Sequence, residues 1–275
     1  MSEFWQSILN DKVVLANILA LGLGLIRLIA LLSFAPFFGP AINMPVRFSL
    51  AIALYFPLHP FLVNIIETQN LLAHFDVLYL FALSVKETIL GMLLGLLSGL
   101  VFYAALSAGL IVDNQRGASQ AIGSEIMSGD EVSPFGEVLF LSMVTLFFAS
   151  GAVLGFLAIL YQGYLMWPVF EFLPSLSSAN IAVFFSREVN SFLTTALLVC
   201  GPFILVSLLT DVSLGIINRF APQLNVYILS MPIKSGLCAF LIVFFVLPYF
   251  DISLWLLAKS SDTLNYFLSF LSGVI

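Results

Sequence analysis

The side chains that could carry chemistry are few in this chain, and they do not fall into a catalytic or ligand-binding pattern. A zinc site needs three or four ligands at short spacing, whereas His59, His74, Cys200 and Cys238 are scattered along the sequence. No GxxxxGK phosphate loop and no GxSxG nucleophile elbow occurs. We therefore predict no metal, no cofactor and no enzymatic activity, and we interpret both cysteines as small apolar core residues.

Polar residues gather in two segments, of which the first spans residues 113–137. It holds five carboxylates, one arginine and four glycines between two apolar runs. This composition favours a loop over a packed helix, and structureless loops of about 25 residues are often functional. Its apolar side chains would be costly to leave in water, so a loop that folds back into a cavity or pore fits better than a solvated connector. The candidate residues are Asp113, Arg116, Gly117, Ile126, Met127 and Phe135.

The second polar segment spans residues 210–236 and predicts a helical hairpin. Asp211, Asn218 and Arg219 recur at helical spacing and form one polar stripe on an apolar helix. Pro222 should end that helix, and Pro232 should lie in the first turn of the next, where proline is tolerated. The expected tip displays four polar residues, namely Arg219, Gln223, Asn225 and Lys234. The partners of Asp211 and Arg219 are expected on other helices or other chains, and an intramolecular ion pair that only fixes packing is an equal alternative.

The composition shows which elements must position these segments. Hydrophobic residues make up 61% of the 275 residues and charged residues 9%, with a formal net charge of −6. Soluble domains carry roughly 25% charged residues, so this is a membrane-class chain. Nucleic acid is excluded as a partner because binding phosphates needs a basic face.

Long apolar runs predict an all-α membrane protein with about six long hydrophobic helices. Each run is long enough for one helix, and they cover residues 13–38, 48–66, 88–112, 138–170, 189–218 and 235–258. Residues 1–11 place Phe4, Trp5, Ile8 and Leu9 on one face, which predicts an N-terminal interfacial helix. The last apolar piece, 264–275, is expected to be a packed or interfacial tail.

Glycine and proline patterns predict how these helices pack and bend. Gly91, Gly95 and Gly99 lie on one helix face, which allows another backbone to approach closely. We favour contact within the chain over contact with a partner subunit. Pro57 and Pro60 should break the second helix around His59, and we interpret this histidine as a structural residue in preference to a proton relay.

The two polar segments resemble one known family, the T subunits of the type III secretion export apparatus, which are related to the flagellar export protein FliR. The second segment carries the resemblance nearly position by position, through Leu214-Gly215, Asn218-Arg219, Ala221, Gln223, Asn225-Val226, Ser230-Met231-Pro232 and Lys234-Ser235. The first agrees independently, through Asp113, Arg116-Gly117-Ala118, Ser133 and Phe135-Gly136. The Arg-Gly-Ala stretch and Met231-Pro232 favour the injectisome branch over the flagellar one.

The resemblance implies a protein-export channel. In this family, T, R and S subunits form a helical pore for unfolded secreted polypeptides within the secretion basal body. The pore lies in the bacterial inner membrane and is raised toward the periplasm, and a U-type switch subunit sits at its entrance. Residues 1–188 would be an R-like portion with residues 113–137 as a pore plug. Residues 189–258 would be an S-like hairpin with its tip at 219–234, followed by a tail at 259–275.

One departure and one rival reading accompany this expectation. Many flagellar relatives carry an Asp-Pro pair in the plug, whereas this chain has Asp130-Glu131 followed by Ser133-Pro134. The alternative function is a secondary transporter of a small solute, which broken helices and intramembrane charges would suit. No internal repeat supports that alternative.

Overall fold

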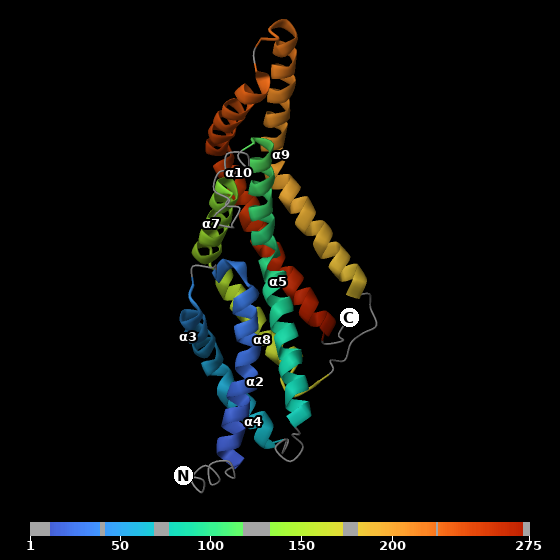
Figure 1. Cartoon of the computed structure of the whole chain (residues 1–275). Helices are drawn as coiled ribbons and strands as arrows, with labels where there is room; N and C mark the ends of the chain where they lie inside the picture. Colours follow the sequence, from blue (N-terminus) through green and yellow to red (C-terminus); the bar gives the residue numbers. More distant parts are fainter. Residues whose placement is uncertain are drawn as a thin grey trace. The chain divides into compact units, whose positions relative to one another are not determined.

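The computed structural model describes residues 12–38, 42–68, 77–117, 133–172, 181–223 and 225–271, and these ranges contain helices and no strand (Figure 1). The predicted all-α fold is confirmed. The α-helices are α2 (Lys12–Phe34), α3 (Met44–Tyr55), α4 (His59–Thr68), α5 (Val77–Gln115), α7 (Pro134–Ala149), α8 (Ala152–Met166), α9 (Ile181–Phe220) and α10 (Val226–Leu271). Short 3₁₀ turns lie at Pro36–Phe38 and Phe56–Leu58. The predicted interfacial helix at residues 1–11 lies outside the described residues.

The helices match the six predicted apolar runs. Within the described residues, five spans are long and apolar enough to cross a membrane, and a sixth is added if α7 and α8 count as one broken span, bent by 76°. Gly151 lies at this break with φ of +77°, a left-handed conformation that favours glycine and ends a helix. We treat the chain as a multi-pass membrane protein.

Several helix boundaries differ from the sequence-based expectation. α9 begins at Ile181, eight residues before the predicted start at residue 189. α5 begins eleven residues before the predicted start at residue 88 and runs through Lys86 and Glu87. α10 begins at Val226, so Pro232 lies inside the helix and not in its first turn. The physical reason is Asn225, whose carbonyl accepts from the Leu229 N–H and whose side chain accepts from the Ile228 N–H. α10 also continues through the piece expected to be a separate tail, where Leu264 and Leu268 are buried.

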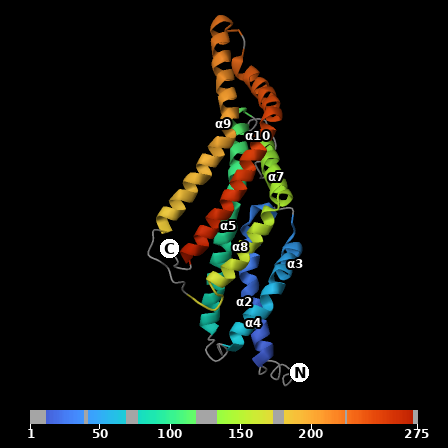
Figure 2. The ribbon, with the colours of Figure 1, turned by 180° about the vertical axis from the view of Figure 1, so that it is seen from behind.

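The chain forms two compact units, and the first comprises residues 1–99, 154–179 and 261–275. In this unit α3 and α4 run beside α2 (Figures 1 and 2). A Cβ on Gly91 would collide with the Arg27 carbonyl, and one on Gly95 would lie 2.8 Å from the Leu31 carbonyl oxygen. α5 and α2 therefore approach closely along this glycine face. The third glycine of the pattern, Gly99, is buried.

The predicted break in the second span is present at Phe56–Leu58, and His59 is the first residue of α4. Both ring nitrogens of His59 have partners inside the first unit. Nδ1 lies 2.7 Å from the Tyr55 hydroxyl and Nε2 lies 3.0 Å from Asn17 Oδ1. These contacts fit the structural interpretation of this histidine.

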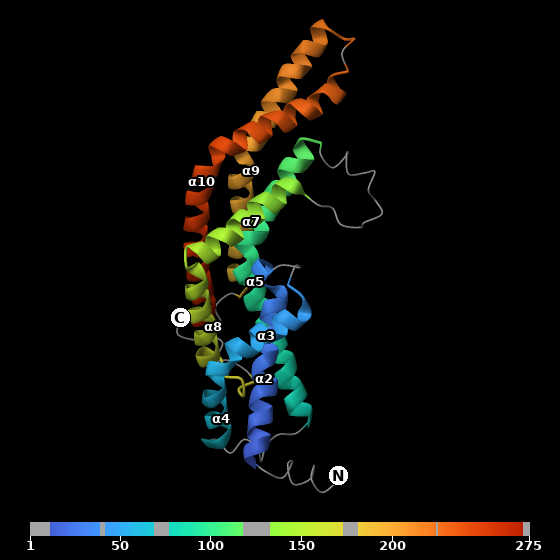
Figure 3. The same cartoon turned by 90° about the vertical axis from the view of Figure 1, so that its left-hand side faces the viewer.

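The second unit comprises residues 100–153 and 180–260. In it α7 lies beside the C-terminal part of α5, and α9 and α10 form a hairpin (Figure 3). A Cβ on Gly109 would collide with the backbone of Gly136, so the helices α5 and α7 nearly touch there. The predicted division at residues 188 and 258 into R-like and S-like portions stays a prediction.

Candidate functional site

Asp113, at the C-terminal end of α5, holds together two segments that flank residues 118–132. Its Oδ1 accepts from Arg116 Nε at 2.7 Å and pairs with Nη2 at 2.6 Å. Its Oδ2 accepts from the Ser133 hydroxyl at 2.5 Å and from the Phe135 N–H at 3.1 Å. Asp113 is only 4% exposed. We call Asp113, Arg116, Ser133 and Phe135 the Asp113 clasp.

Local sequence explains why the clasp forms. Ser133 is the N-cap of α7 and accepts from the Gly136 N–H at 2.9 Å, with Pro134 at the first helical position. Asp113 adds a carboxylate at this helix start, where negative charge is favoured. The guanidinium of Arg116 lies 5.3 Å from the centre of the Phe135 ring, a cation–π contact. The clasp is therefore closed by charge, hydrogen bonds and an aromatic face together.

A second ion pair lies beside the clasp and joins the two helices of the hairpin. Lys234 Nζ, on α10, lies 2.6 Å and 2.7 Å from the two carboxylate oxygens of Asp211 on α9. It also donates to the Gln115 carbonyl at the end of α5, at 3.3 Å. Lys234 is buried, whereas the Asp211 side chain is 48% exposed. The intramolecular alternative for Asp211 is thus the one observed.

The hairpin tip differs from its prediction at one residue. The expected display of Lys234 is wrong, because its ammonium turns inward to Asp211 and Gln115. The other predicted tip residues are exposed, namely Asn218, Arg219, Pro222, Gln223, Asn225 and Pro232. Their role in contacting partner subunits stays a prediction. In the predicted plug, Ile126 and Met127 lie outside the described residues.

A buried charge cluster in the first unit was missed by sequence reasoning. Glu87, fully buried on α5, accepts from Arg27 Nε at 2.6 Å and from Arg27 Nη2 at 2.9 Å. The ammonium of Lys86 lies 2.7 Å from the same carboxylate. Arg27 is the only charge in residues 13–38, and an isolated charge in a membrane helix requires a partner. This rule could have predicted a partner for Arg27, and Glu87, just before the run at 88–112, was one of the available carboxylates.

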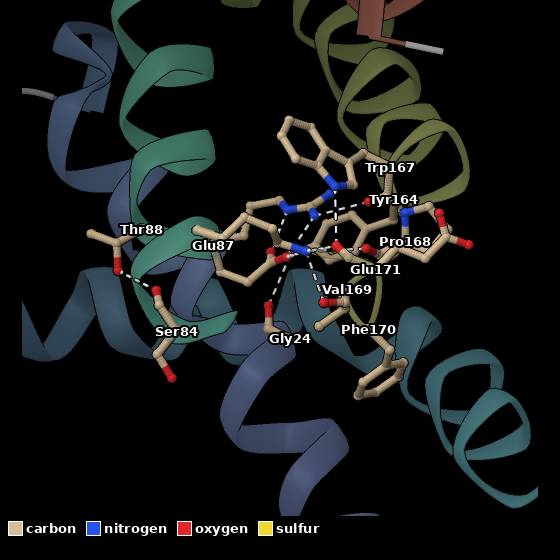
Figure 4. Close-up of polar contacts among 12 residues, drawn as sticks. Gly24, Ser84, Glu87, Thr88, Tyr164, Trp167, Pro168, Val169, Phe170 and Glu171 are labelled. Atoms are coloured by element: carbon tan, nitrogen blue, oxygen red, sulfur yellow. Dashed lines mark hydrogen bonds and ion pairs between the residues drawn. The ribbon is translucent and has the colours of Figure 1, made fainter. Parts of the chain in front are cut away.

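The same two cations bind the backbone where α8 ends. Arg27 donates to the carbonyls of Gly163 and Trp167, and Lys86 donates to those of Pro168, Val169 and Glu171 at 2.8–3.1 Å. Figure 4 shows Glu87 facing Tyr164 and Trp167, beside the chain from Pro168 to Glu171. The last carbonyls of a helix lack helical partners and favour positive charge. The cluster therefore fixes the end of α8 against α2 and α5.

In both charged sites, the Asp113 clasp and the Arg27–Glu87–Lys86 cluster, the charged side chains hold helix ends and loop backbone in place. Among the described residues, no group of three or more His, Cys, Asp or Glu side chains could hold a metal ion. Each charge of the Asp113 clasp and of the Arg27–Glu87–Lys86 cluster is bound by other protein groups. Both sites can join helices to the segments that follow them, which suits a structural part of a larger assembly.

Comparison with known proteins identifies the family of this chain. Residues 18–260 match the family of bacterial export proteins, family 1. The chain belongs to this family. The match covers every described helix from α2 to most of α10, including both polar segments.

Individual relatives agree with the family match. The chain is 39% identical to Yop proteins translocation protein T of Yersinia pestis over 62% of this chain and 65% of the relative. It is 30% identical to secretion system apparatus protein SsaT of Salmonella typhimurium over 69% of this chain and 71% of the relative. It is 25% identical to the flagellar biosynthetic protein FliR of Bacillus subtilis over 58% of this chain and 62% of the relative.

The resemblance deduced from the two polar segments is confirmed by these comparisons. The secretion relatives are more similar than the flagellar one, which supports the injectisome branch. The matched region spans 65% of the length of the Yersinia relative, slightly less than two thirds.

Proposed function

We propose that this protein is a structural and gating component of the export gate of a bacterial type III secretion system. The observation that carries the proposal is the family match over residues 18–260, together with relatives named for translocation and secretion. On this proposal the chain joins R-type and S-type subunits in the inner membrane, inside the secretion basal body and raised toward the periplasm. A U-type subunit lies at the entrance, and unfolded polypeptides pass through the pore.

Within this channel, the segment from Asp113 to Glu137 is the plug, although its first and last residues belong to α5 and α7 and not to the predicted loop. Mixed polarity supports this role, because a pore must wet for passage and seal by dewetting at apolar residues. Ile126 and Met127 supply the apolar seal, and the Asp113 clasp anchors both ends of the loop. Deleting residues 123–129 should raise the leak of small ions through the assembled complex while the complex still assembles. An unchanged leak in an assembled complex would refute the plug.

The hairpin tip is the second functional part, as a contact for partner subunits. Arg219 is exposed in the last turn of α9, at the hairpin tip, so its removal should not disturb folding. Arg219→Ala should therefore reduce co-purification with the R-type and S-type subunits and reduce secretion. The matched control is Lys12→Ala, an exposed cation at the start of α2. If Arg219→Ala co-purified with these subunits and secreted as the wild type does, the proposed contact would be refuted.

The rival reading, a secondary transporter, depends on charges inside membrane helices. Arg27, Lys86 and Glu87 are such charges, but their hydrogen-bonding groups are engaged with each other and with carbonyls at the end of α8. This arrangement favours a structural role. Uptake of a small solute by vesicles that contain only this chain would support the transporter instead.

A further inference from the structure

The α9–α10 hairpin contacts the residues on both sides of the segment 118–132, namely the end of α5 and the start of α7. At the first end, Lys234 of α10 donates to the Gln115 carbonyl. One turn earlier in α10, Met231 lies against Gly117, where an added Cβ would be 3.2 Å from the Met231 Cγ. Gly117 has φ of +77°, so its backbone turns the chain out of α5 at the point of contact.

Aromatic side chains connect the hairpin to the second end. The Phe135 ring packs edge-on against Phe203 of α9, with 5.1 Å between the ring centres. Phe203 packs edge-on against Phe245 of α10, with 5.2 Å between the ring centres. Further along, the buried Tyr249 of α10 donates its hydroxyl proton to the Leu139 carbonyl of α7 at 2.6 Å. Movement of the hairpin relative to α7 would therefore disturb packed rings and a buried hydrogen bond.

Asp113 joins these two connections into one. It binds Arg116 on the first side and Ser133 and the Phe135 N–H on the second. Gln115, which Lys234 holds, is only two residues from Asp113. The contacts of Lys234 and those of Asp113 therefore meet in the last turn of α5.

We propose that Lys234 is a positioning residue that holds the C-terminal end of α5 and, through Asp113, the start of α7 against the α9–α10 hairpin. Its ammonium neutralises Asp211 and caps a carbonyl in the last turn of α5, where a cation is favoured. The capped turn in turn sets the position of Asp113 and, through Asp113, the start of α7. The functional consequence rests on the plug proposed above: a partner that shifts the hairpin would shift the two helix ends that flank the plug.

The test measures amide hydrogen exchange by mass spectrometry in the purified export complex. Lys234→Met should raise exchange at Arg116–Gly117 and also at Phe135–Gly136. The expected increase is about fivefold, the factor that loss of one ordinary hydrogen bond predicts. The matched control is Lys259→Met, because Lys259 also links α10 to α9, through Ser191 at 3.2 Å. It should leave both sites within about twofold of wild type.

Unchanged exchange at Phe135–Gly136 in Lys234→Met would overturn the proposal, because the hairpin would then hold only the first end. Exchange that rises along the whole of α9 and α10 would mean that Lys234→Met unfolds the hairpin. Asp211→Asn then serves as the second variant, because it removes the charge that pairs with Lys234 at a half-exposed position. An increase confined to the two ends supports the proposal, and no increase there overturns it.

Ion leak through the same complexes separates this proposal from the plug. Faster exchange at both ends without added leak would keep the positioning role and count against the plug. Added leak with unchanged exchange at Phe135–Gly136 would keep the plug and overturn the positioning role of Lys234.

Discussion

Replacing Glu87 by glutamine should destabilise the first unit strongly. The wild-type carboxylate is fully buried and neutralises two cations, with three contacts of 2.6–2.9 Å to Arg27 and Lys86. The amide keeps the shape of the side chain but leaves both cations without a counter-charge. Breaking a buried ion pair by removing one partner costs about 3–5 kcal/mol. We expect a loss of unfolding free energy in that range for Glu87→Gln.

Thermal unfolding of the purified protein in detergent, followed by tryptophan fluorescence, measures this loss. Trp167 is a suitable reporter because its ring lies 5.6 Å from the Lys86 ammonium. Since about 1 kcal/mol shifts Tm by roughly 2–4 °C for domains of this size, Tm should fall by about 6–20 °C.

The matched control is Glu67→Gln, which removes an exposed carboxylate from α4 of the same unit. Its Tm should stay within about 2 °C of wild type, as surface substitutions do. If Glu87→Gln shifted Tm no more than this control, the assignment of the cluster as a structural lock would be wrong.

Four further substitutions test the packing, a buried hydrogen bond and a helix cap with the same assay. Gly91→Ala should cost about 1–3 kcal/mol, because its Cβ would collide with the backbone of α2. Gly155→Ala, where a Cβ meets open space in α8, should instead be neutral or stabilise by up to about 1 kcal/mol; equal effects of the two would contradict the packing account. Tyr249→Phe should cost about 1 kcal/mol by removing the buried hydrogen bond to Leu139, and a wild-type Tm would exclude that bond. Asn225→Ala should cost about 0.5–1 kcal/mol by uncapping α10, whereas a gain in stability would mean that α10 begins elsewhere.

The sequence alone was sufficient for the helical class and for the order of the membrane helices. Apolar runs of this length have one stable form in a membrane, so their number and order follow from composition. The break before His59 also followed, since Pro57 removes a backbone donor there.

Helix ends could not be predicted as well, because they depend on partners distant in sequence. The uncharged run at 88–112 predicts a helix that starts after Lys86 and Glu87. The helix α5 instead runs through both, because Arg27 and the end of α8 satisfy them. Similarly, Pro232 suggested a helix start, but the Asn225 cap begins α10 earlier.

The candidate sites likewise combine residues that local sequence patterns reveal with contacts that depend on partners distant in sequence. Asp113 and Arg116 stand out in the sequence as charges beside a glycine-rich segment, and their role in a plug stays a prediction. The bond from Ser133 to Asp113 closes across 20 residues and depends on where α7 begins. Lys234 was placed at the tip because its sequence position suggested exposure. Its pairing with Asp211 depends on the register between α9 and α10, which no local pattern specifies.

The central claim is that this protein is part of a protein-export apparatus. The most direct measurement is to delete its gene in the source organism and to quantify the proteins in the culture supernatant by mass spectrometry under secretion-inducing conditions. The account predicts that a defined set of exported proteins disappears from the supernatant, remains in the cells, and returns when the wild-type gene is supplied on a plasmid. An unchanged set of exported proteins in the deletion strain would contradict it.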